Sequence, residues 1–130
     1  MSKHMDTGSW PVVRINYEST MSRGDIEEIL ATMVSLLRKR ERFAYISDLR
    51  SGFSPDAKQR QLIADYYRDN VDALKRYVAA GATVTDTPQA GPQHGAALAI
   101  SWQQAPPFPR DEFADVPSAE RWVQSKLDGN

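Results

Sequence analysis

A cluster of polar side chains near the middle of the chain could bind or transfer an anionic group. It follows the apolar run that begins at Phe43 and comprises five residues: Asp48, Arg50, Ser51, Ser54 and Lys58. A serine beside a helix start meets free backbone amides and the positive end of the helix dipole, so Ser51 or Ser54 could carry a phosphate. Arg50 and Lys58 could meet an acidic group, while Asp48 would orient the turn.

The same residues also have an ordinary structural explanation. Serine is a frequent helix N-cap and proline is favoured at the first helical position, so Ser54 and Pro55 predict a helix start. Asp48 and Ser51 would then cap the turn, and Arg50 would be solvated. Under both explanations the residues lie at the carboxyl end of a strand, where open α/β sheets keep their sites.

His94 offers a second kind of chemistry. It lies in Gly91-Pro-Gln-His-Gly95 and could act as a general base if it faced Asp48 or Ser51, so a small hydrolase-type enzyme is one alternative. The segment lacks the spacing of a nucleotide-binding loop, and no G-x-S-x-G elbow fixes a nucleophile. Because His94 is the one histidine outside the first few residues and cysteine is absent, we expect no metal site and no cofactor.

Hydrophobic periodicity predicts the elements that position these residues. Strands are expected over 10–18, 43–49, 78–85 and 110–114, each with alternating or continuous apolar residues. Helices are expected over 23–40 and over 55–77, with Asn70 as a candidate break in the second. Further helices are expected after Thr87-Pro88 or Gly91-Pro92, and after Ser118 as a cap.

The order strand then helix, repeated four times, predicts a single α/β domain. Its sheet would have four mainly parallel strands joined by right-handed crossovers and covered by helices. The domain would span residues 10–127, with a short tail at 128–130. Residues 1–9 are small, polar and without periodicity, so we expect a disordered or tag-like tail there.

Charge and composition narrow the classes of partner. With 16 basic and 17 acidic residues the chain has no overall positive field, so nucleic acid is not an expected partner. The run Arg38-Lys-Arg-Glu-Arg42 is typical of a solvated helix end that complements the helix dipole. The absence of cysteine and of any apolar run of about 18 residues predicts a cytoplasmic protein without a membrane span.

A third function class is a carrier of a small apolar or lipid-like ligand. Such a ligand would lie between the sheet and the helices, against large side chains of the longest helix and the one after it: Tyr66, Tyr67 and Trp102. Aromatic residues at helical spacing are equally typical of an ordinary core.

The chain resembles small bacterial α/β domains with the STAS-like fold, which are related to anti-sigma-factor antagonists and CRAL-TRIO-type lipid carriers. The resemblance lies in the strand Tyr45-Ile-Ser-Asp-Leu-Arg50 before a capped helix, in the strand after Arg76-Tyr77, and in the ending from Pro107 to Val123. STAS-type antagonists are phosphorylated on a serine of an Asp-Ser-Ser/Thr-Gly motif at the start of their second main helix. Here the matching region has the sequence Ser51-Gly-Phe-Ser-Pro-Asp56 instead.

The resemblance implies a non-enzymatic regulatory or protein-interaction domain with a role in signalling. We therefore expect a protein partner at the surface formed by Asp48, Arg50, Ser51, Ser54 and Lys58. A homodimer through an edge strand or an exposed helix is also open from the sequence.

Overall fold

Parallel pairing of neighbouring strands organises the sheet. The computed structural model describes residues 4–86 and 108–129, and within them the strand order is β1-β2-β3-β4-β5. β1 pairs antiparallel with β2, whereas the pairs β2–β3, β3–β4 and β4–β5 are parallel. The strands are β1 (Met5–Ser9), β2 (Val12–Asn16), β3 (Phe43–Asp48), β4 (Val78–Val84) and β5 (Arg110–Phe113).

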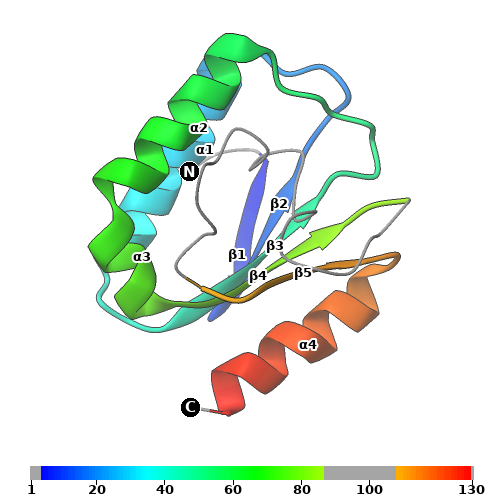
Figure 1. The fold of residues 1–130 in the computed structure, drawn as a ribbon. Coiled ribbons are helices and arrows are strands. Elements are labelled where there is room, and N and C mark those ends of the chain that lie inside the picture. Colours follow the sequence, from blue (N-terminus) through cyan, green and yellow to red (C-terminus); the bar gives the residue numbers. More distant parts are fainter. Residues whose placement is uncertain (1–3, 87–107, 130) are drawn as a thin grey trace.

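Helices cover both faces of the sheet. Those described are α1 (Arg23–Leu37), α2 (Ala57–Asp69), α3 (Val71–Tyr77) and α4 (Val116–Asp128). Figure 1 shows α1, α2 and α3 together on one face and α4 alone on the other. Because β2, β3, β4 and β5 pair in parallel, their carboxyl ends lie along one edge of the sheet.

Two separate cores follow from the alternation of side chains along the strands. In β3, Phe43 and Tyr45 face α1 to α3, whereas Ala44 and Ile46 face α4. The core under α4 is built mainly from small residues, and it consists of Val12, Ala44, Ile46, Ala80, Ala82, Val84, Ala119 and Val123. Alanines at the sheet surface let α4 pack close to β3 and β4.

The sheet corrects two of our expectations. It has five strands rather than four, and residues 5–9 of the segment expected to be a disordered or tag-like tail form β1, which pairs antiparallel with β2. Met5 is only 6% exposed and packs into the core under α1, which gives this polar segment a reason to pair with β2. The α/β class and the mostly parallel sheet are confirmed.

Carboxylates cap two helices for which we expected serine. α2 begins at Ala57 with Asp56 as N-cap, and Asp56 and Gln59 form a capping box, so Ser54 is not the cap. Asp115 caps α4 by accepting a hydrogen bond from the backbone amide of Ser118, which had been expected in that role. In both cases a carboxylate stands near the serine, and an ionised oxygen accepts the amide hydrogen bond more strongly than a hydroxyl.

Two predicted helices are shorter than expected. α1 ends at Leu37 rather than at residue 40. The helix expected over 55–77 begins at Ala57 and is divided into α2 and α3 at Asn70, the candidate break in the sequence. The helix expected after residue 87 lies outside the described residues. None of the described helices is long and apolar enough to cross a membrane.

Candidate functional site

The predicted site lies in the loop that joins β3 to α2, residues 49–56, which we call the edge loop. Both neighbouring strands hold it in place. The backbone amide of Leu49 donates to the carbonyl of Val84 at the end of β4, at 2.8 Å. The hydroxyl of Ser51 donates to the carbonyl of Tyr17, just past β2. The loop is thus fixed at the carboxyl edge of the sheet, as the sequence predicted.

Apolar contacts fix the middle of the edge loop. Phe53 is 5% exposed and stacks on the ring of Tyr17, with 5.3 Å between ring centroids. The end of the loop is held from α2, because Arg60 donates to the carbonyl of Pro55 at 2.8 Å. Gln59 is buried and donates to the carbonyl of Met21 at 2.7 Å, which ties the start of α2 to the segment before α1.

Asp48 and Arg50 form a two-point ion pair at the base of the edge loop. Nε and Nη2 of Arg50 donate to Oδ1 and Oδ2 of Asp48 at 3.0 and 2.7 Å, and the Arg50 amide also donates to Oδ1. These hydrogen bonds from Arg50 lower the pKa of Asp48 below its ordinary value. Asp48 therefore orients the turn, whereas Arg50 already has a carboxylate partner.

Ser54 and Lys58 differ from the other predicted site residues. Both are exposed, and neither side chain makes a hydrogen bond or an ion pair within residues 4–86 and 108–129. The structure thus divides the predicted set in two. The side chains of Asp48, Arg50 and Ser51 make hydrogen bonds that hold the loop together, whereas those of Ser54 and Lys58 make none within the described residues.

The ligand-carrier residues Tyr66 and Tyr67 lie in the core between α2 and the sheet. The Tyr67 and Tyr45 hydroxyls are 2.9 Å apart, and burial raises the pKa of both groups. Beside them is a cavity of about 30 Å³, which Tyr17 and Ser47 also line. Ligand pockets usually have roughly 300 Å³ or more, so the described residues enclose no ligand-sized space there. Trp102, the third residue of this hypothesis, lies outside the described residues.

The catalytic hypothesis depends on His94, which also lies outside the described residues. Asp48 and Ser51, its expected partners, are engaged with Arg50 and with the Tyr17 carbonyl. No group of three or more histidine, aspartate or glutamate side chains within the described ranges is arranged to hold a metal ion.

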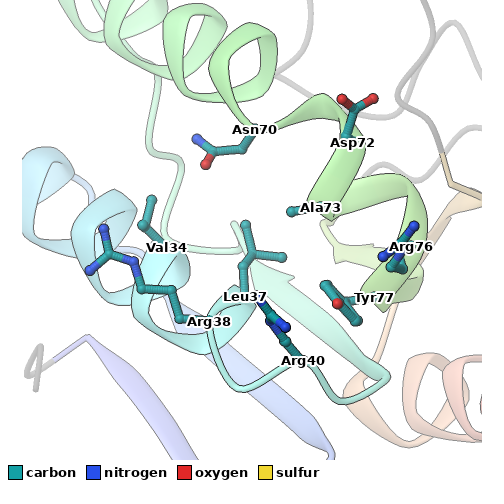
Figure 2. A pocket seen from close by; sticks show the side chains of 9 residues that line it. All are labelled: Val34, Leu37, Arg38, Arg40, Asn70, Asp72, Ala73, Arg76 and Tyr77. Atoms are coloured by element: carbon teal, nitrogen blue, oxygen red, sulfur yellow. The ribbon is translucent and has the colours of Figure 1, made fainter.

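A groove that we had not predicted lies at the opposite edge of the sheet, between the end of α1 and α3. It has a volume of about 500 Å³ and is lined by Val34, Leu37, Arg38, Arg40, Asn70, Asp72, Ala73, Arg76 and Tyr77. Figure 2 shows that Arg38 and Arg40 come from the α1 side and Arg76 from the α3 side. The sequence had indicated only a solvated helix end for Arg38 and Arg40. The signal we missed is that Arg40 and Arg76 precede Phe43 and Val78, which pair with each other.

Comparisons with known proteins do not identify the chain. No family model matches it, and no curated protein and no solved structure gives a significant match.

Proposed function

We propose that this chain is a non-enzymatic regulatory or protein-interaction domain, and that a protein partner contacts the edge loop and the first turn of α2. The observation that carries the proposal is the rigid attachment of a polar loop at the carboxyl edge of the sheet. Hydrogen bonds to the carbonyls of Tyr17, just past β2, and Val84, at the end of β4, hold residues 49–56 together with a bond from Arg60 of α2, while Ser54 and Lys58 remain exposed.

Rigidity matters because binding orders the groups at an interface, and a loop that is already ordered loses less conformational entropy. Loops held by a rigid scaffold are common places for binding residues. Lys58 in the first turn of α2 would meet an acidic group of the partner, and Ser54 would donate a hydrogen bond. Arg50, whose side chain is 42% exposed, would offer the outer side of its guanidinium.

The proposal agrees with the resemblance to STAS-like domains, in which the same region carries the regulated serine. Here Ser54 is the exposed serine closest to the start of α2, and Ser51 is occupied by its bond to Tyr17. If the domain is controlled by phosphorylation, Ser54 is the residue that we expect to accept the phosphate.

Affinity capture from the native cell tests the proposal. Lys58→Glu reverses an exposed charge, and a carboxylate in the first turn of a helix is favourable for the helix dipole, so the variant is expected to fold. Lys75→Glu is the matched control, since Lys75 is exposed on α3 and lies away from the edge loop. We expect a specific partner to be lost with Lys58→Glu and kept with Lys75→Glu. An identical set of partners for wild type and Lys58→Glu would contradict the proposal.

A further inference from the structure

We propose that the groove between the end of α1 and α3 binds an anionic small molecule that also has an apolar portion. This site is independent of the edge loop. α1 runs from the carboxyl edge, where the edge loop lies, back to the start of β3, so the groove lies at the other edge of the sheet. The chain would then have a ligand site and a protein-contact site at opposite edges.

Charge is the first argument for an anionic ligand. The side chains of Arg38, Arg40 and Arg76 make no hydrogen bond or ion pair within the described part of the chain. Asp72 is the one carboxylate in the lining, and it forms no ion pair with Arg76 although it lies four residues before it. Three guanidinium groups thus stand beside one carboxylate. Guanidinium is the group that best matches the planar oxygens of a carboxylate or phosphate.

The strand register explains why these arginines meet. Phe43 and Val78 are partners at the start of β3 and β4. Arg40 and Arg76 lie just before these residues, so the parallel pairing brings together two side chains that are far apart in the sequence. Arg38, at the C-cap of α1, joins them from the end of the helix.

The end of α1 alone does not account for the arginines. Basic residues are favourable at a helix C-terminus, which would explain Arg38. Arg40, however, has a φ of 58°, in the left-handed region that favours glycine. The chain therefore keeps a long cationic side chain at a position where glycine would be the easier residue. Arg76 comes from a different helix.

The size and floor of the groove indicate the rest of the ligand. Its volume of about 500 Å³ is within the range of small-molecule pockets. Beside its polar side chains, the lining has an apolar part formed by Val34, Leu37, Ala73 and the ring of Tyr77 (Figure 2). A ligand with a phosphate or carboxylate beside an aromatic or aliphatic group would satisfy both parts of this surface.

Titration of the full chain with phenyl phosphate, followed by amide NMR signals, tests the proposal. Inorganic phosphate is the probe for the anionic part of the ligand, and benzyl alcohol is the probe for its apolar part. We expect saturable shifts of the amides of Leu37, Ala73 and Tyr77 with phenyl phosphate, weaker binding of inorganic phosphate, and no saturable binding of benzyl alcohol. Arg76→Gln should weaken phenyl phosphate binding by about fivefold or more, because it removes a charge-assisted hydrogen bond.

Arg40→Gly separates ligand binding from folding. Glycine suits the left-handed backbone, so the variant should keep or raise the thermal midpoint while it weakens phenyl phosphate binding. Arg23→Gln, at the exposed start of α1, removes the same charge at the other end of the helix and should bind as wild type does.

Several results would overturn the proposal. The first is that phenyl phosphate shows no saturable binding, and the second is that the shifted amide signals belong only to residues away from the groove. The third is that Arg23→Gln loses as much affinity as Arg76→Gln. Equal affinity for inorganic phosphate and phenyl phosphate would refute the apolar portion. Binding of a polyglutamate peptide in the groove without binding of phenyl phosphate would show a protein-docking surface instead.

Discussion

The carboxylate of Asp48 holds the guanidinium of Arg50 by two hydrogen bonds, of 3.0 and 2.7 Å, at the point where β3 enters the edge loop. A pair only two residues apart in sequence fixes the direction of the chain as it leaves the sheet. The side chain of Asp48 is 16% exposed and that of Arg50 is 42% exposed, so the pair is partly exposed at the protein surface. Its role is to shape the loop.

Asp48→Asn should therefore lower the free energy of unfolding slightly at neutral pH, since partly exposed ion pairs contribute little. The pKa of Asp48 is lowered in the folded state, so its contribution is present above the ordinary pKa of about 4. It is lost as the pH falls through the folded value. Urea unfolding of wild type and Asp48→Asn should thus show a difference near neutral pH that disappears in acid. A difference that grows in acid would contradict this role.

The tyrosine hydroxyls of the core allow a matched pair of substitutions. The hydroxyl of Tyr45 is hydrogen-bonded to Tyr67 at 2.9 Å, whereas that of Tyr66 is buried without a hydrogen-bond partner among the described residues. Tyr45→Phe should lower the free energy of unfolding by about 1 kcal/mol. Tyr66→Phe should leave it unchanged or raise it, because an unsatisfied buried group is removed. Urea unfolding at neutral pH measures both, and a greater loss in Tyr66→Phe would show that its hydroxyl has a partner.

The buried tyrosines also predict the response to alkali. Burial raises the pKa of Tyr17, Tyr45, Tyr66 and Tyr67 in the folded state. The contribution of these hydroxyls to the free energy of unfolding is therefore fully present below the unfolded pKa of about 10. It is lost as the pH rises through their folded pKa values. The urea midpoint should be level up to about pH 9 and fall between about pH 10 and about pH 12, and by less in Tyr66→Phe than in wild type. A midpoint that stays constant over this range would refute the burial of these hydroxyls.

Gly81 provides a test of packing between the sheet and Tyr45. A Cβ at this position would lie 2.7 Å from Cζ of Tyr45 and 3.0 Å from Cε1 of Phe108, closer than ordinary contacts. Gly81→Ala should lower the free energy of unfolding by about 1–3 kcal/mol, since both rings are buried and cannot easily move. Gly24→Ala in α1 is the control, because its Cβ would lie 3.7 Å from the nearest atom. The control should be neutral or stabilising by at most about 1 kcal/mol, and equal losses in both variants would contradict the predicted clash.

Most of the sheet could be predicted from the sequence because side-chain alternation reports burial directly. The apolar run from Phe43 to Asp48 is a strand covered on both faces, as its composition indicates. β1 could not be predicted in this way. The segment Met5-Asp-Thr-Gly-Ser9 has little intrinsic strand preference, and its pairing with β2 depends on the burial of Met5 in a core formed by distant residues.

The candidate sites show the same limit. The position of the edge loop followed from strand order, but which of its side chains are hydrogen-bonded depends on partners such as Tyr17, which the local sequence does not reveal. The arginine groove depends on the register between Phe43 and Val78, so no local pattern marks it. The strand order thus predicts the end of the sheet at which the loop lies, whereas contacts with residues distant in the sequence determine which of its side chains are hydrogen-bonded.

The central claim is that a protein partner contacts the edge loop, and a photo-cross-linking amino acid placed at Ser54 in the native cell tests it most directly. Ser54 is exposed and its side chain makes no hydrogen bond within the described residues, so the replacement should not disturb the loop. We predict a specific cross-linked protein from position 54 and none from the same group placed at Lys75. The same cross-linked products from both positions, or none from position 54, would contradict the claim.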